Sequence, residues 1–255
     1  MNVQTTTWKS GCGSTDREKI MSTFFGALGF ACLSILLALA GFVAIWRNGS
    51  RGMSRILVAL ALDVVILAYP AYLGWQYRKL PAIHDITTDP IDPPRFEALA
   101  RLRAGDGANT AVYAGLYSAE LQRAAWPDIE PVDLDVPVQR AFEVALQVVT
   151  KRKWLIIDER APQPPRRIGR IEAVARTPIM GFREDVTIRV TPDGEGSRVD
   201  IRSSSRYFES DLGSNAARVS KLIEDINTAA EAAALKPVKK IPAPTPKAPA
   251  KTVKK

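Results

Sequence analysis

The chain has 255 residues, 46% of them hydrophobic and 24% charged, which is enough for one or two domains. Two cysteines and one histidine exclude a disulfide-stapled fold and a zinc site built from Cys and His ligands. The formal net charge is +8, but residues 236–255 alone hold seven lysines and no acid, leaving 28 basic and 27 acidic residues elsewhere. Residues 80–235 hold 20 basic and 24 acidic residues, a net of −4. We therefore expect no nucleic-acid partner, and also no cofactor and no bound metal.

Two long apolar segments lie near the N-terminus. Residues 21–46 form a run of 26 without a charge, and residues 56–77 form a run of 22 that contains Asp63 and Pro70. A bilayer core is crossed by about 20 apolar residues in a helix. The sequence therefore predicts a polar leader over residues 1–20 and a transmembrane hairpin over residues 21–77, with the lipid bilayer as its partner.

A cleavable signal peptide is the alternative for the first run. The residues Ala38-Leu39-Ala40 before Gly41 fit the small-residue pattern that signal peptidase cuts. However, the apolar run continues beyond that point, and a 20-residue polar leader is long for a signal peptide. We therefore interpret the first run as a membrane span.

The membrane orientation is inferred from the basic residues around the spans. The loop between them, residues 47–55, has three arginines and no acid, whereas five basic residues flank the outer ends of the spans: Lys9, Arg17, Lys19, Arg78 and Lys79. The density of positive charge is higher in the loop, which favours a cytoplasmic loop. The number of positive charges is higher at the outer ends, which favours the opposite topology. We follow the density, which predicts a multi-pass protein of the bacterial inner membrane with a periplasmic soluble domain.

Asp63 is an ionisable residue inside a predicted span. A charged carboxylate at such a depth costs about 2.5–3.5 kcal/mol on insertion scales, and neither span contains a basic residue to pair with it. We expect a neutral acid that bonds Ser34 or another copy of the chain, in a homo-oligomer formed through the spans. The alternative, a proton or ion relay, would need several polar groups along one path.

The soluble part is predicted to be an α+β domain over residues 80–235. Residues 80–94 contain four prolines and read as an extended connector. Apolar residues at helical spacing predict helices after Pro94 and over 118–125, 136–149 and 215–235, and alternation predicts strands over 155–158, 167–176, 183–191 and 198–206. The expected fold is a two-layer domain with a four-stranded antiparallel meander and covering helices.

Residues 236–255 differ in kind from the domain. They hold seven Lys and five Pro, and they cannot bury enough apolar area to order themselves. The segment is predicted to be a disordered tail. It is either a solvated spacer or an adhesive segment that binds an anionic surface of the envelope.

The first candidate functional cluster lies in the connector, where His84, Asp85 and Asp89 stand close together in sequence. A histidine beside carboxylates can act as a general base in catalysis. The alternative is that these side chains cap turns, because neighbours in an extended chain point to opposite sides. We favour the structural role.

The second candidate cluster is a predicted ligand-binding surface near the last strand and last helix. Its members are polar or charged: Arg202, Ser205, Arg206, Asp211, Asn215, Arg218, Arg189 and Asp185. Alternation places several of them on the sheet face away from the apolar layer, where arginines could bind a carboxylate or phosphate. The alternatives are ordinary cross-strand ion pairs, helix caps, or an ion-pair knot that joins the strand to the helix.

A set of short motifs resembles a bacterial and plastid family, the domain-of-unknown-function family 1499, over about residues 82–225. The motifs are HDITTD (84–89) with Pro93-Pro94 and Phe96, Trp126-Pro127-Asp128-Ile129, Arg170-Ile171-Glu172-Ala173, Gly181-Phe182 with Asp185-Val186, Arg189, Asp200-x-Arg202-Ser203-x-Ser205-Arg206 and Ser210-Asp211-Leu212-Gly213-x-Asn215-Ala216-x-Arg218. The family pattern usually has Tyr where Trp126 stands. The resemblance implies an envelope-associated domain and imports no known reaction.

These observations together predict an integral membrane protein that acts as a non-enzymatic binding or assembly factor of the cell envelope, with an Arg/Asp-lined surface for an anion. The alternative is a membrane-anchored enzyme that uses His84 with the nearby Asp and Arg clusters. We further expect residues 80–235 to fold as a soluble monomer without the hairpin. We also expect Arg202, Arg206, Arg218 and Asp211 to matter more to function than His84.

Overall fold

The computed structural model describes residues 12–49, 51–103, 108–165 and 167–234. The predicted tail over residues 236–255 lies outside these residues, as do residues 1–11 of the predicted leader. The remainder of that leader is helical, because the first helix begins at Cys12.

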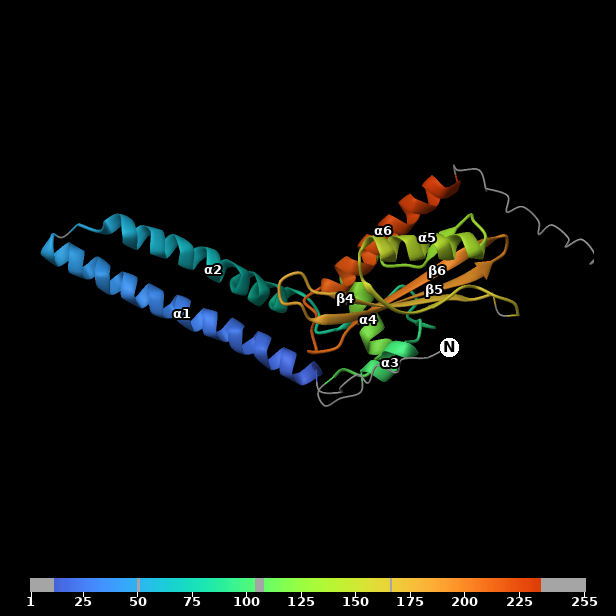
Figure 1. The fold of residues 1–255 in the computed structure, drawn as a ribbon, viewed down its shortest axis with the longest axis horizontal. Coiled ribbons are helices and arrows are strands. Elements are labelled where there is room, and N and C mark those ends of the chain that lie inside the picture. The colour runs from blue at the N-terminus through green and yellow to red at the C-terminus, as the bar shows by residue number, and fades with distance from the viewer. Residues whose placement is uncertain (1–11, 50, 104–107, 166, 235–255) are drawn as a thin grey trace, which may run out of the picture.

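Two long helices form an antiparallel hairpin, α1 (Cys12–Asn48) and α2 (Met53–Lys79), which extends away from the domain (Figure 1). Both are long and apolar enough to cross a membrane, and most of their side chains are exposed, unlike those of a core helix in a soluble protein. Where the helices touch, Ser34 Oγ donates a hydrogen bond to Asp63 Oδ2 at 3.0 Å. The buried acid therefore has the serine partner that the sequence suggested.

The domain is built on one antiparallel sheet with the strand order β1-β6-β5-β4-β3. The meander is formed by β3 (Leu155–Arg160), β4 (Gly169–Arg176), β5 (Arg183–Asp193) and β6 (Gly196–Ser205), which confirms the predicted α+β architecture. Two short strands add to it, β1 (Asp85–Thr87) and β2 (Val132–Leu134), and both pair with β6. The proline-rich segment is thus partly a strand and not only a connector.

One face of the sheet is apolar and is covered by α5 (Val138–Lys151) and α6 (Ser214–Ala234), as Figure 1 shows. Ile171, Ile188 and Ile201 lie opposite one another on β4, β5 and β6, and all three are fully buried. The helices contribute Phe142, Val149, Val219 and Leu222 to the same core. This face matches the amphipathic patterns of the sequence.

The second face of the sheet is also covered, which the sequence did not indicate. The helix α3 (Ala98–Leu102) lies on the side opposite α5 and α6 in Figure 1, while α4 (Leu116–Ala125) packs beside β1. Phe96 and Leu99 pack on Val174 in a small second core. Glu172, Asp185 and Arg202 on this face are consequently buried instead of facing water.

The domain joins the hairpin at one end of the sheet. The β4–β5 loop and the β6–α6 loop lie at that end, next to the end of α2 (Figure 1). The Asp211 N–H donates to Ile83 O at 3.1 Å, and Gly213 has a φ of 81°. A Cβ at Gly213 would lie 2.9 Å from Leu80 Cδ1, so the leucine side chain would have to shift, and the positive φ itself favours glycine here.

Candidate functional site

The charged face is organised around Arg202, whose side chain is 2% exposed. Its Nε and Nη2 donate to Asp85 Oδ1 and Oδ2 at 2.9 and 2.6 Å, which is a two-point guanidinium–carboxylate pair between β6 and β1. Nη1 and Nη2 also donate to Pro94 O and Ala111 O at 3.1 and 3.0 Å. The centre of the Phe96 ring lies 4.6 Å from the guanidinium carbon. Arg202 therefore ties the covering segment to the sheet.

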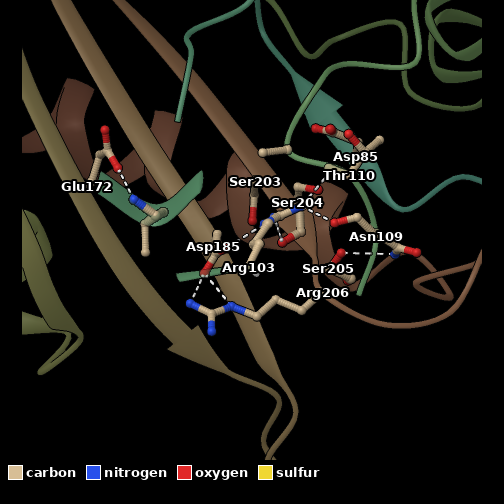
Figure 2. A network of polar contacts seen from close by, with 12 residues as sticks. Asp85, Arg103, Asn109, Thr110, Glu172, Asp185, Ser203, Ser204, Ser205 and Arg206 are labelled. Carbon is tan, nitrogen blue, oxygen red and sulfur yellow. Dashed lines mark hydrogen bonds and ion pairs between the residues drawn. The ribbon is translucent and has the colours of Figure 1, made fainter. Parts of the chain in front are cut away.

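Asp185 is the second residue around which this charged face is organised, and its carboxylate accepts hydrogen bonds from two arginines (Figure 2). Arg103 Nε donates to Oδ2 at 2.6 Å, and Arg206 Nε and Nη2 donate to Oδ1 at 2.9 and 2.8 Å. Arg103 also donates to Thr110 O at 2.9 Å and to Ser204 O at 3.0 Å. The carboxylate and both guanidinium groups are buried, so Asp185 holds the end of α3 against β5 and β6.

Arg218 lies on the other side of the sheet. It pairs with Glu184, which neighbours Asp185 on β5 and therefore points to the opposite face. Ser205 Oγ and Ser214 Oγ donate to the same carboxylate at 2.9 and 2.7 Å. The structure thus separates Arg218 from Arg202 and Arg206, which the sequence had grouped in one groove.

Asn215 and Asp211 organise the start of α6. Asn215 accepts a hydrogen bond from Ser203 Oγ at 2.7 Å and donates to His84 O at 3.0 Å and to Ser205 Oγ at 2.9 Å. Asp211 Oδ1 and Oδ2 accept from the N–H groups of Gly213 and Asn215 at 2.8 and 2.9 Å. Burial raises the pKa of Asp211 to about 6, against the opposing effect of these two hydrogen bonds. Both residues are helix-terminus groups.

A more exposed ion-pair cluster lies toward the far end of β5 and β6. Arg189 donates to Asp200 Oδ2 at 2.9 Å and to Asp92 Oδ2 at 2.7 Å. Arg198 donates to Asp200 Oδ1 at 3.1 Å, and Asp89 Oδ2 lies 3.4 Å from both arginines. Two arginines here pair with three carboxylates, so this cluster resembles the cross-strand charge ladder that the sequence offered as an alternative.

His84, Asp85 and Asp89 do not converge on one point. Asp85 faces Arg202, whereas Asp89 Oδ1 accepts from the N–H groups of Ile91 and Asp92 at 3.1 and 3.0 Å, closing a turn. The pKa of His84 is lowered chiefly by burial, with a contribution from Arg103 and Arg202 and an opposing one from Asp85. The imidazole is therefore neutral at pH 7.

Two residues that hold this face together were missed from the sequence. Arg103 was expected only to end a helix, although it lies seven residues after Phe96 and four after Leu99, on the same helical stripe. Glu172 was noted only as part of a motif, and it accepts from the N–H groups of Glu97 and Leu99 at 2.7 and 2.8 Å. It thereby caps α3. In the part of the chain that the structure describes, no cluster of His, Cys, Asp and Glu is arranged to hold a metal ion.

Comparison with protein-family models matches residues 85–226, more than half of the chain, to the family described as "Protein of unknown function (DUF1499)". The chain belongs to the DUF1499 family. Many of the residues in the family motifs form the ion pairs and helix caps of this DUF1499 protein. They are Asp85, Glu172, Asp185, Arg202, Arg206, Asp211, Asn215 and Arg218.

Solved structures give a weaker likeness. TTHA0849 from Thermus thermophilus is 13% identical and covers 40% of this DUF1499 chain and 95% of its own, with a TM-score of 0.22. CalU16 from Micromonospora echinospora is 17% identical and covers 41% and 84%, also with a TM-score of 0.22. The comparison with curated proteins gave no match. At these TM-scores the likeness adds nothing about function.

Proposed function

We propose that this DUF1499 protein is a membrane-anchored, non-enzymatic binding or assembly factor of the bacterial cell envelope. In this proposal α1 and α2 cross the inner membrane and the domain lies on the periplasmic side. The observation that carries the proposal is that the acidic groups on the charged face already have partners within the fold. Asp85 binds Arg202, and Asp185 binds both Arg103 and Arg206.

A catalytic acid or base must have an open position within hydrogen-bond reach of a substrate. Asp185 has both oxygens occupied by guanidinium groups, and its side chain is fully buried. Arg202 has its two-point contact filled by Asp85, and its Nη1 and Nη2 also donate to backbone carbonyls. A buried network in which each of these charged groups is paired favours one rigid arrangement, which suits a scaffold that presents a fixed surface.

The membrane anchor is supported by the length, apolar composition and exposure of α1 and α2. The periplasmic placement follows from the three arginines in residues 47–55, by the density of positive charge. A reporter that is active only in the periplasm, fused after Lys255, checks the placement. Activity supports it, and activity of a cytoplasm-only reporter at the same junction reverses the topology.

The anion-binding surface remains a prediction. Arg202, Arg206 and Arg218 each pair with a carboxylate, so an incoming carboxylate or phosphate would have to displace Asp85, Asp185 or Glu184. This geometry favours the ion-pair knot over the open groove. We therefore leave the anion out of the proposed function.

A membrane-anchored enzyme that uses His84 is the second candidate. The half-buried imidazole has a lowered pKa and is neutral at pH 7, which is the form that a general base needs. The competing observation is that His84 contributes its backbone carbonyl to the fold, accepting from the N–H of Ser205 and from Asn215 Nδ2. A side-chain substitution leaves those backbone contacts in place.

Complementation of a deletion strain distinguishes the two candidates. The strain's detergent sensitivity is measured with wild type and with His84→Gln, while immunoblotting of membranes gives the abundance of each protein. The proposal predicts full complementation by His84→Gln at equal abundance. Loss of complementation with unchanged abundance would favour the enzyme and overturn the proposal.

A further inference from the structure

We propose that the end of the domain beside the hairpin rests on the bilayer, with an apolar tip inserted among the lipid headgroups. The tip consists of the β4–β5 loop, Thr177–Phe182, and of Phe208 from the neighbouring β6–α6 loop. This inference rests on the membrane anchor of the proposed function. It adds a second contact between the protein and the membrane.

The composition of the β4–β5 loop is unusual for a connection between two strands. Such connections are normally made of polar residues with Gly, Asn or Asp. This loop reads Thr-Pro-Ile-Met-Gly-Phe, without a charge, and Ile179 at its centre is 67% exposed. The three larger apolar side chains, of Ile179, Met180 and Phe182, are concentrated in one short turn. Such a concentration marks an interaction site more than a single exposed apolar residue does.

Phe208 joins this loop from a second segment. Its ring packs edge-on against the ring of Phe182, with the centroids 5.2 Å apart, and it is 43% exposed. Its φ of 70° is a conformation that residues other than glycine rarely adopt. Asn109 Nδ2 donates to Phe208 O at 2.8 Å, which holds the backbone in that conformation. The ring is thus fixed at the surface by the fold.

The β4–β5 loop is also shaped before any partner binds. Thr177 Oγ1 accepts from the N–H of Phe182 at 2.9 Å, and Thr177 O accepts from the N–H of Gly181 at 3.1 Å. Gly181 has a φ of 67°, so the turn uses a glycine where another residue would be strained. A preformed apolar loop loses little conformational entropy when it inserts.

The position of the tip indicates that the bilayer is what it contacts. The tip lies beside the last turn of α2 in Figure 1, and only residues 80–84 separate α2 from β1. The C-terminal end of α2 holds Trp75 and Tyr77, residue types that favour the headgroup layer, and Lys79 Nζ lies 4.2 Å from the Trp75 ring centre. The N–H of Asp211 bonds Ile83 O, so the loop bearing Phe208 is fixed to the same connector. If α2 spans the membrane, the tip therefore lies at the depth of the lipid headgroups.

Charge near the tip is compatible with anionic lipid. Arg176 is exposed at the start of the loop, and Arg78 and Lys79 lie at the end of α2. Basic residues at that depth are attracted to anionic headgroups. Glu209 is exposed beside Phe208 and opposes this attraction. The apolar side chains therefore carry most of the contact.

The test uses the full chain in nanodiscs of phosphatidylethanolamine and phosphatidylglycerol, with Cys12 and Cys32 replaced by alanine. A single cysteine is labelled with an environment-sensitive fluorophore at Ile179→Cys, with Pro178→Cys as a second position in the same loop. The matched control is Ile91→Cys, because Ile91 is 95% exposed and neighbours Asp92, which bonds Arg189. Arg189 is seven residues along the chain from Phe182 of the tip, about 23 Å away. A label at Leu62→Cys, inside α2, reports on the anchor.

We expect blue-shifted emission at 178 and 179, with quenching by lipid-borne nitroxide and protection from iodide. The label at 91 stays aqueous, and the label at 62 reports lipid. Aqueous labels at 178 and 179 with lipid contact at 62 overturn this inference and leave the anchor intact. Aqueous labels at all positions overturn the anchor itself. Protection from iodide without nitroxide quenching means that protein covers the tip, from a second copy or another partner, and also overturns the inference.

Discussion

The two faces of the sheet are buried by different means. On one face the row Ile171, Ile188 and Ile201 meets α5 and α6. On the other, the equivalent row is Glu172, Thr187 and Arg202, and these residues are buried as completely as the isoleucines. In this domain, the burial of a side chain therefore cannot be predicted from its hydrophobicity alone. A charged face becomes an interior when each charge finds a partner in the covering segment.

The difference has energetic consequences. Contacts on the apolar face are many and individually small, so trimming one side chain costs a fraction of the total. On the charged face the removal of one partner leaves an unpaired ion away from water, and that is far more expensive. We expect single substitutions on the charged face to be strongly destabilising, even though each intact ion pair adds little net stability.

The largest expected effect is that of Arg202→Leu. The substitution leaves Asp85 buried without its partner and frees the carbonyls of Pro94 and Ala111. We predict a loss of about 3–5 kcal/mol in the free energy of unfolding. Chemical unfolding of the full chain in nanodiscs, followed by tryptophan fluorescence, measures it. A loss below about 1 kcal/mol would mean that the charged face is open to water.

A second prediction uses pH, because Asp211 has a pKa raised to about 6 by burial. The folded state then binds a proton more tightly than the unfolded chain, so the wild type gains stability as the pH falls through that value. Relative to Asp211→Asn, we expect a gain of up to about 3 kcal/mol between about pH 7 and pH 4. Melting temperatures of the two proteins across this range give the comparison. Parallel pH profiles would show that the carboxylate is not buried.

On the apolar face, Ile188→Val removes one methyl group from the centre of β5, where the side chain is fully buried. We predict a loss of about 0.5–1.5 kcal/mol, clearly less than that of Arg202→Leu. The same unfolding assay serves for both variants. If the valine variant is the less stable of the two, the comparison between the faces fails.

The smallest effect is expected at the surface. Arg140 pairs with Glu143 at 3.1 Å along one face of α5, and their side chains are 41% and 51% exposed. Arg140→Ala should change the unfolding free energy by no more than about 0.5 kcal/mol. This variant calibrates the assay, since it removes an ion pair without leaving a buried charge. A cost near that of Arg202→Leu would argue against burial as the cause.

Much of the fold could be predicted because its elements are long enough to show a period. The four strands of the meander and helices α5 and α6 were expected from alternation and from amphipathic stripes. The strands β1 and β2 were not, because three residues are too few for a period and their pairing with β6 is a tertiary effect. The sequence placed Arg202 and Asp185 on one face, but nothing in it specified which carboxylate each arginine would reach. Arg103 and Glu184 were missed for that reason.

The most direct test of the structural role of the charged face is Arg206→Lys, with stability and complementation measured on the same protein. Arg206 donates to Asp185 through both Nε and Nη2. A lysine keeps the positive charge but cannot make this two-point contact. We predict a loss of roughly 1–3 kcal/mol in stability, with complementation falling in proportion to the abundance of the protein in membranes. Loss of complementation at unchanged stability and abundance would contradict the account, because it would give Arg206 a direct part in function.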